Sequence, residues 1–498
     1  MRLGVPKKTF PGLGKRIEYR YAGSTLPSLV VLSGFWRSRS GGTVPMRAQF
    51  CTPVISRRAV LAAVAGVAVS PLAACRLGPG QRSETAPPAP VTLRLNSSAA
   101  EMGQMAAVRL PAFEQRYPHI KVIFEEMPDY GAKLFVLAAG GSLGDVAMGF
   151  TNTGQYHFLA LNGIFLDHDA FVARDKYDLR QFYDLAVQAI RVNGKLYGLP
   201  FKGQIARIAL FFNVDLFEKH GLRLPTPEWT YNDLAEAAVR LTVREGGQVV
   251  QWGYAGNWRE LTTMIASTRP WGGDVFSPDG KRCLLAEKGA KDAIIWHYDL
   301  LHKFGAALYP PLGDPNNTFY EGQAAMLGRV NVGIAGFIVT RAQGRYRWGM
   351  VRMPKGPAGK RGGMWLPGTM SATRFTKYPQ ESWELVKWCC DKESGVALAL
   401  QTEGSSTPGA RPDVYADPRL ANRPGYPEGL IDEQRRAMDE PEPYVNPWNF
   451  TGDEVNRIIA AELDKITKGE AGLNDGWFQA LAQQVQSILD KPVPALTA

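Results

Sequence analysis

The segment from residue 91 to residue 149 repeats strand-like and helix-like patterns of apolar and polar positions. Residues 91–95 alternate between apolar and polar side chains, which predicts a strand, and residues 120–124 and 144–149 predict two more. Apolar residues recur at helical spacing over 101–116, and a second helix is predicted over 130–139, before a Gly-Gly pair. This strand–helix–strand–helix–strand order is typical of an α/β domain with a largely parallel sheet.

Polar side chains follow the first and third of these strands. Ligands of parallel sheets bind beyond the carboxyl ends of the strands. We therefore expect one shared rim to carry the polar residues Asn96, Ser97, Ser98, Thr151 and Asn152.

A second run of similar patterns follows the first. A strand is predicted over 205–213 and a helix over 214–220, and Thr230 is placed to cap a helix over 231–241. The pattern continues to about residue 345, without internal repeats or low-complexity segments. The sequence therefore predicts two α/β units.

An uncharged, Ala- and Val-rich segment at 59–74 precedes both units. Its sixteen residues fall short of the ~20 that a membrane-spanning helix needs, and Pro71 lies near its end. Behind basic residues, such a segment is typical of a signal peptide. Arg57-Arg58 resembles a twin-arginine export signal, and Leu72-Ala73-Ala74-Cys75 resembles a lipobox whose cysteine becomes lipidated. The alternative is a buried Ala-rich helix of the fold.

The position of this segment divides the N-terminal region into three parts. Met46 would start a presequence of ordinary length, so residues 46–74 are interpreted as a lipoprotein signal peptide and residues 1–45 as a non-native upstream extension. Residues 75–90 are rich in Pro, Gly and small polar residues, which predicts a flexible tether. We expect Cys75 to carry the lipid.

The formal net charge of +10 suggests an anionic partner, but the charge is unevenly placed. Residues 1–74 hold eleven basic residues and one acidic residue, so the rest of the chain is formally neutral. This distribution disfavours nucleic acid and a strongly anionic ligand. Of the five cysteines, Cys51 and Cys75 lie in or at the end of the predicted signal peptide, and Cys283, Cys389 and Cys390 lie beyond the tether. Ordinary packing is favoured for these three over a disulfide from Cys283, and none has metal-ligand spacing.

A set of degenerate motifs occurs in a fixed order across the two units. The motifs lie at 113–122, 194–200, 212–222, 319–326 and 404–411, and include GKLYGLP and FNVDLFEKHGL. Their order and spacing resemble the bacterial extracellular solute-binding proteins of ABC importers, in the sugar-binding group that includes the maltose-binding type.

The resemblance implies an α/β, two-lobed periplasmic-binding-protein fold, in which each lobe is a mostly parallel sheet flanked by helices. It divides the body into 91–203 plus 347–393 for one lobe and 204–346 plus 394–498 for the other. Chain crossings near 201–204, 345–347 and 391–394 would form a hinge that closes around ligand.

A carbohydrate needs flat apolar faces for its C–H surfaces and fixed hydrogen-bonding groups for its hydroxyls. Trp258, Trp365 and Trp448 lie within two residues of glycine or proline in predicted loops and are the candidate aromatic contacts; the alternative for each is core packing or a surface anchor. The candidate polar contacts are Asn96, Ser98, Glu101, Asn152, Gln204, Arg207 and Asp274. For Arg207, a structural salt bridge is the alternative, because an unpaired charge in an apolar strand is costly.

The sequence contains no His-Glu-x-x-His or Walker motif. Residues 140–144 match Gly-x-Ser-x-Gly, but they lead from a predicted helix into a predicted strand, whereas the nucleophile elbow of a hydrolase leads from a strand into a helix. Together with the resemblance, this leads us to expect a non-enzymatic, monomeric binding protein without metal or cofactor, held by a lipid anchor at the extracytoplasmic side of the cell membrane, in the periplasm or at the outer face. It would deliver a carbohydrate to ABC permease subunits. A secreted lipoprotein glycosidase, which needs only two suitably placed carboxylates, stays open, as does binding of a glycerol derivative, polyamine or peptide.

Overall fold

The structure is a computed structural model, and it describes most of the chain beyond the predicted tether. The described residues are 89–127, 130–151, 154–203, 205–206, 209–329, 333–402, 404–440, 452–492 and 495. They all fall within one compact unit. The predicted extension, signal peptide and Cys75 lie outside the described residues, as do Asn152, Gln204, Arg207 and Trp448.

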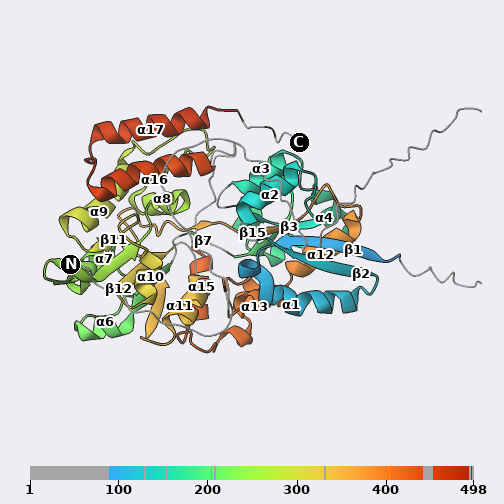
Figure 1. The fold of residues 1–498 in the computed structure, drawn as a ribbon, viewed down its shortest axis with the longest axis horizontal. Helices are drawn as coiled ribbons and strands as arrows, with labels where there is room; N and C mark the ends of the chain where they lie inside the picture. Colours follow the sequence, from blue (N-terminus) through green and yellow to red (C-terminus); the bar gives the residue numbers. More distant parts are fainter. Residues whose placement is uncertain are drawn as a thin grey trace, which may run out of the picture. The chain divides into compact units, whose positions relative to one another are not determined.

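The first lobe is built on a five-stranded mixed sheet with the strand order β2-β1-β3-β15-β6. Its strands are β1 (Val91–Ser97), β2 (Ile120–Glu126), β3 (Val146–Phe150), β6 (Leu199–Lys202) and β15 (Gly368–Ala372). β1 pairs in parallel with β2 and β3, whereas β15 is antiparallel to both of its neighbours (Figure 1). The predicted α/β pattern of this lobe is therefore confirmed, with one antiparallel strand inserted.

Helices and two short strands complete the first lobe. They are α1 (Ala99–Arg116), α2 (Tyr130–Ala139), α3 (Gln155–Leu161), α4 (Asp169–Asp175), α5 (Asp184–Ala189), β4 (Arg191–Val192), β5 (Lys195–Leu196) and α12 (Pro379–Cys389). α1 buries Met102, Met105, Ala106, Leu110 and Phe113, which lie on one face at helical spacing. This face packs into the same core as β1 and β3.

The second lobe is built on a six-stranded mixed sheet in which β11, β10, β12, β8 and β13 are neighbours and β9 pairs with β10. Its strands are β8 (Ala209–Asn213), β9 (Val243–Glu245), β10 (Gln248–Gly256), β11 (Ala307–Leu308), β12 (Ala324–Arg329) and β13 (Trp348–Arg352). β10 is parallel to β11 and β12, and β8 is antiparallel to β12 and β13.

Helices cover both faces of the second sheet, as alternate residues of β8 show. Leu210 and Phe212 join one core cluster, whereas Ala209 and Phe211 join another. The first cluster includes α7 (Tyr231–Leu241), α8 (Leu261–Thr268), α9 (Lys288–Tyr298), α16 (Gly452–Lys468) and α17 (Asp475–Leu489). The second includes α10 (Pro315–Tyr320), α11 (Ile334–Ala342), α14 (Pro412–Tyr415) and α15 (Leu430–Met438). α13 (Lys392–Ala399) contributes Val396 and Ala399 to this cluster and Leu398 to the core of the first lobe. α6 (Val214–Lys219) follows β8 directly.

Two helix predictions are confirmed to the residue, at 130–139 and 231–241. The second helix begins at a capping box, in which the Thr230 hydroxyl accepts a hydrogen bond from the backbone N–H of Asp233 (3.2 Å). The Asp233 carboxylate in turn accepts one from the N–H of Thr230 (2.7 Å). The described part of the chain contains no helix long and apolar enough to span a membrane.

Two chain crossings connect the lobes through the short strands β7 (Ile205–Ala206) and β14 (Met364–Trp365). These strands pair with each other in antiparallel orientation. The predicted boundary at 346/347 is wrong, because β13 pairs with β8 along its full length and so belongs to the second sheet. The strand predicted over 205–213 is divided into β7 and β8.

Candidate functional site

The two sheets turn their carboxyl edges toward the crossings. β6 ends at Lys202, and β8 begins at Ala209, which pairs with Arg329 and Arg352, the last residues of β12 and β13. Residues 203–208 therefore connect the carboxyl edges of both sheets, and so short a segment spans at most ~20 Å. Because ligands of α/β sheets bind at this edge, the crossings mark the candidate site.

On the first lobe, the rim contains a buried ion pair. Lys202 is 0% exposed, and its Nζ lies 2.5 Å from Oε2 of Glu101, whose side chain is 23% exposed. Glu101 belongs to the first turn of α1, and Ser98 is the N-cap residue of that helix. A carboxylate is favourable at a helix N-terminus, and a buried ammonium needs a partner. Ser98 and Glu101, two predicted site residues, therefore lie at the carboxyl end of β1.

Aromatic side chains pack beneath the crossings. Trp365 of β14 is 1% exposed, and its ring centroid lies 5.0 Å from that of Tyr183, which lies 6.0 Å from Tyr415. The hydroxyls of Tyr183 and Tyr415 are buried and make no hydrogen bond. A Cβ atom at Gly203 would lie 2.9 Å from the Tyr415 hydroxyl, so the crossing strand needs glycine there. The predicted site residue Trp365 is thus at the crossing, as a buried side chain.

On the second lobe, a cavity of 270 Å³ opens beyond the ends of β10 and β11. Its walls are formed by Asn257, Glu260, Pro310, Gly313, Asp314, Pro315 and Asn316. The Asp314 carboxylate caps α10 by accepting hydrogen bonds from the backbone N–H groups of Asn316 and Asn317 (2.9 and 3.2 Å). Oδ1 of Asn316 is buried without a hydrogen-bond partner, so it is an acceptor still open to a ligand.

Sequence reasoning missed this cavity. A signal was present, because Asn257 directly follows β10, and Asp314, Asn316 and Asn317 lie six to nine residues after β11. However, β11 contains only Ala307 and Leu308, and so short a strand has no recognisable alternation.

Two predicted polar contacts make structural interactions within their own lobes. Asn96 is fully buried; its amide donates to Glu125 (2.6 Å) and accepts from the N–H of Gly144 (2.5 Å), so it links β1 to its neighbours. Asp274 pairs with Arg269 at 2.9 Å. Burial raises the pKa of Asp274, against the lowering effect of Arg269. Both side chains have structural partners.

Trp258 lies in the core of the second lobe. It is 1% exposed, its indole N–H donates to Oγ1 of Thr467 (3.1 Å), and its ring stacks on Tyr309 at 5.0 Å between centroids and 18° between planes. The core-packing alternative therefore describes Trp258, although the preceding residue, Asn257, lines the rim cavity.

The described titratable groups give no sign of a metal centre. Within the described ranges, no group of three or more His, Cys, Asp or Glu side chains could hold a metal ion. Burial lowers the pKa of both His157 and His168 to about 4, and it raises the pKa of the free thiols of Cys389 and Cys390. The rim itself offers amides, carboxylates and hydroxyls, which suit hydrogen bonding to a polar, uncharged ligand.

Several solved structures share this architecture. An ABC substrate-binding protein from Listeria monocytogenes in complex with cycloalternan superposes with a TM-score of 0.68 at 17% identity, covering 80% of this chain and 98% of that one. The GacH receptor of Streptomyces glaucescens, solved unliganded and with acarbose and an acarbose homolog, gives a TM-score of 0.66 at 21% identity. The match covers 81% of this chain and 99% of that one. The two-lobed fold is therefore confirmed.

Sequence comparison identifies the family. A protein of Brucella abortus (strain 2308) that is named as a binding protein is 24% identical over 390 residues, which are 76% of this chain and 88% of that protein. Residues 96–396, more than half of the chain, match the family described as bacterial extracellular solute-binding protein. The chain therefore belongs to the family of bacterial extracellular solute-binding proteins.

Proposed function

We propose that the protein captures a carbohydrate between its two lobes and delivers it to the permease of an ABC importer. The proposal rests on one observation. The carboxyl edges of both sheets are joined by the same crossing, and hydrogen-bonding groups lie on each side of it. The sugar-type ligands named for the Listeria and Streptomyces structures support the same ligand class.

The ligand contacts in this proposal come from both rims. The first lobe contributes Ser98 and Glu101, and the second contributes Asn257 and Asn316. The predicted contacts Asn152, Gln204, Arg207 and Trp448 stay in the proposal on sequence grounds. Asn96 and Trp258 are left out because their side chains are buried, and Asp274 because it pairs with Arg269 and does not line the cavity of the second lobe. Glu101 stays in the proposal although it pairs with Lys202, because its side chain is 23% exposed.

The paired strands β7 and β14 would act as the hinge. The pairing of these two strands restricts the lobes to opening and closing, because twisting would break the pairing of Met364 with Ala206 and of Trp365 with Ile205. A ligand that contacts both rims binds the closed state more tightly than the open one and therefore shifts the population toward closure. Permease subunits would recognise that closed state.

The membrane attachment belongs to the same proposal. Cys75 would carry the lipid, residues 75–90 would act as the tether, and the mature protein would face the outside of the membrane. Cys75→Ser is expected to move the protein from the membrane fraction to the soluble fraction. Retention of the variant in the membrane fraction would contradict the lipid anchor without affecting the ligand proposal.

A titration tests the ligand proposal directly. Intrinsic tryptophan fluorescence of the mature chain is measured against a panel of mono- and oligosaccharides, with chromatography of each mixture for products. We expect saturable binding without turnover, and about tenfold weaker binding in Asn316→Ala, because one hydrogen bond is lost. Asn232→Ala, on the outer surface of α7, is the matched control and should leave affinity unchanged. Hydrolysis of a glycoside, or no saturable response across the panel, would overturn the proposal.

A further inference from the structure

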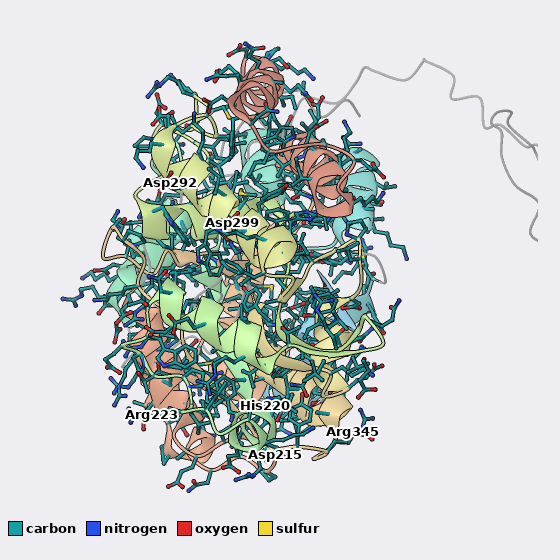
Figure 2. All side chains as sticks on the ribbon, turned by 90° about the vertical axis from the view of Figure 1, so that its left-hand side faces the viewer. Asp215, His220, Arg223, Asp292, Asp299 and Arg345 are labelled. Carbon is teal, nitrogen blue, oxygen red and sulfur yellow. The ribbon has the colours of Figure 1, made fainter. Side chains whose placement is uncertain are left out.

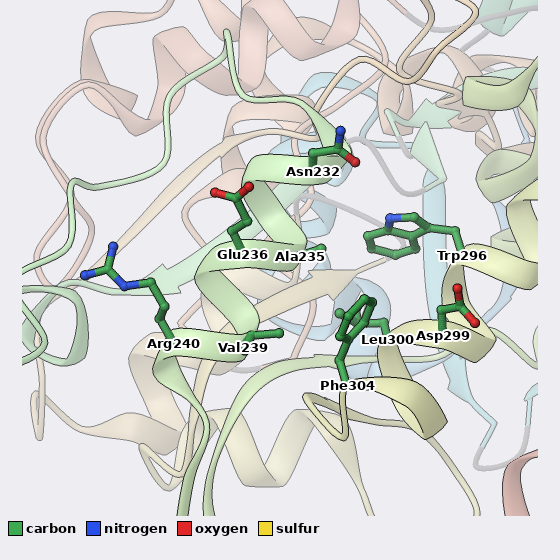
Figure 3. Close-up of a pocket in the computed structure, with 9 residues that line it drawn as sticks. All are labelled: Asn232, Ala235, Glu236, Val239, Arg240, Trp296, Asp299, Leu300 and Phe304. Carbon is green, nitrogen blue, oxygen red and sulfur yellow. The ribbon is translucent and has the colours of Figure 1, made fainter.

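A second cavity lies in the second lobe, among side chains of α7 and α9. It has a volume of 490 Å³ and is a groove between α7 and the π-helical turn Asp299–Lys303 that extends α9. Figure 3 shows α7 as one wall, and Trp296, Asp299, Leu300 and Phe304 as the other. Figure 2 looks onto the second lobe, where Asp292 of α9 and Asp299 are labelled. None of these residues belongs to the rims at the crossings.

The groove has an apolar floor that is partly open to solvent. Ala235, Val239, Trp296, Leu300 and Phe304 supply the apolar side chains. Val239 is 44% exposed and Phe304 is 47% exposed, which is unusual for large apolar residues that stand beside one another. Protein–protein contact surfaces combine an apolar, aromatic-rich centre with a polar rim, and this groove has both parts.

The π-helical turn is a second, independent feature of the groove. Such turns are rare and occur frequently at functional sites. Here the turn follows α9 directly and brings Leu300 and the next residue after the turn, Phe304, into the lining of the groove. The widened turn therefore shapes the groove.

The charged residues along the two sides of the groove follow the same order, acidic before basic. On α7, Glu236 precedes Arg240 by four residues. On the opposite side, Asp299 precedes Lys303 by four residues, and Nζ of Lys303 lies 5.3 Å from the ring centroid of the lining residue Phe304. Both walls run the same way in Figure 3, from Asn232 and Trp296 at one end to Arg240 and Phe304 at the other. Asp299 and Lys303 lie 3.8 Å apart, and so long and exposed an ion pair is weak enough to leave both charges for a partner.

We propose that this groove docks an amphipathic α-helix of a partner protein, which lies antiparallel to α7. The partner helix presents large apolar residues to Val239, Leu300 and Phe304. An acidic residue in its first turn faces Arg240 and Lys303, and a basic residue one turn later faces Glu236 and Asp299. This order of acid before base also suits the dipole of the partner helix itself, and the antiparallel orientation suits the dipole of α7. The length of the floor, from Asn232 to Arg240, corresponds to about 12 Å, or two helical turns.

The test uses the mature chain and synthetic helical peptides. A panel of fluorescent, end-capped peptides carries Glu and, four residues later, Lys, with varied large apolar residues on the adjacent face. A second panel has Glu and Lys exchanged. By fluorescence anisotropy, we expect the best Glu-before-Lys peptide to bind at least about tenfold more tightly than its exchanged form. Val239→Glu should abolish this binding. Val136→Glu, at a 70% exposed position of α2, is the matched control and should leave it unchanged.

A charge exchange separates recognition from folding. In the double variant Glu236→Lys with Arg240→Glu, the preference should shift toward the exchanged peptides, a result that loss of structure cannot produce. The proposal is overturned if no peptide binds the wild type better than Val239→Glu, or if affinity ignores charge order. It is also overturned if light scattering shows a dimer that Val239→Glu dissociates, because the occupant is then a second copy of this chain.

Discussion

The ammonium of Lys202 lies 2.5 Å from the carboxylate of Glu101, and the two ends of this ion pair differ in burial. Lys202 is fully buried at the end of β6, just before the chain crosses to the second lobe, whereas the side chain of Glu101 is 23% exposed. The pair therefore connects the first turn of α1 to the strand that leads into the second lobe. Removal of the carboxylate and removal of the ammonium should therefore lower the free energy of unfolding by different amounts.

Glu101→Gln is expected to destabilise the protein more than Lys202→Met. Removal of the carboxylate leaves a buried ammonium without its counter-charge, which costs about 3–5 kcal/mol of unfolding free energy. Removal of the lysine leaves a carboxylate that water can still reach, so the loss should be about 1–2 kcal/mol. Urea unfolding of both variants measures the difference, and equal losses would contradict the asymmetry. Glu114→Gln, which breaks the exposed pair with Lys121, should cost less than about 1 kcal/mol.

His168 should make stability fall in mild acid. Its Nδ1 donates to the carbonyl oxygen of Leu166 (2.7 Å), and its Nε2 accepts from the backbone N–H of Ala372 (3.2 Å), so the fold requires the neutral ring. Burial lowers its pKa from 6.5 to about 4. The unfolded chain therefore takes up a proton below pH 6.5 that the folded chain does not, and stability is lost as pH falls from 6.5 toward 4.

The variant His168→Gln measures this contribution. Gln can replace both hydrogen bonds but does not titrate, so the variant should lose about 2 kcal/mol less unfolding free energy than the wild type between pH 7 and pH 5. Urea unfolding at the two pH values provides the comparison. Since burial also lowers the pKa of His157 to about 4, part of the acid sensitivity should persist in the variant. Identical pH dependence in variant and wild type would show that His168 is not responsible.

The predicted elements that were confirmed are those set by local chemistry. The helix at 231–241 carries its own start signal in Thr230 and Asp233, and 130–139 is bounded by Gly140-Gly141. The lobe boundary failed because it depends on pairing between strands distant in sequence. Nothing in the alternation of residues 348–352 tells that β13 will pair with β8 rather than with a strand of the first sheet.

The residues of the candidate site also separate into those that local sequence predicts and those that depend on a distant partner. Ser98 and Glu101 were predictable because they follow directly after a recognisable strand. Trp258 also follows a strand, at Asn257, but its side chain turns inward to Thr467 of α16, which lies more than two hundred residues later in the chain. Sequence periodicity gives the position of a residue along an element but not the distant partner that decides between core and cleft.

Gly404 should be intolerant of any side chain. It has a φ of +73°, and a Cβ atom there would lie 2.2 Å from the carbonyl oxygen of Ala100 in α1. Close by, a Cβ atom at Gly336 of α11 would lie 2.7 Å from Oγ of Ser406, so this loop is packed between helices of the two lobes.

Gly404→Ala is therefore expected to lower the free energy of unfolding by about 1–3 kcal/mol more than Gly163→Ala. Gly163 has a similar φ of +64° but open space around its Cβ position, so its substitution reports the backbone conformation alone. Urea unfolding of both variants tests the difference. Equal losses would mean that the loop moves away from α1 without cost.

Trp258 and Trp365 should separate stability from ligand response. Trp258→Phe removes the hydrogen bond to Thr467 and part of the stacking on Tyr309, so the free energy of unfolding should fall by about 2 kcal/mol. Because this residue lies in the core of one lobe, the ligand-induced change in fluorescence should remain.

Trp365 lies in β14, and its ring contacts Tyr183 of the first lobe, so hinge closure should change its surroundings. Trp365→Phe should therefore remove most of the ligand-induced signal, measured by titration with a sugar that binds. The opposite result, with the signal lost in Trp258→Phe and kept in Trp365→Phe, would move the site away from the crossings and into the second lobe.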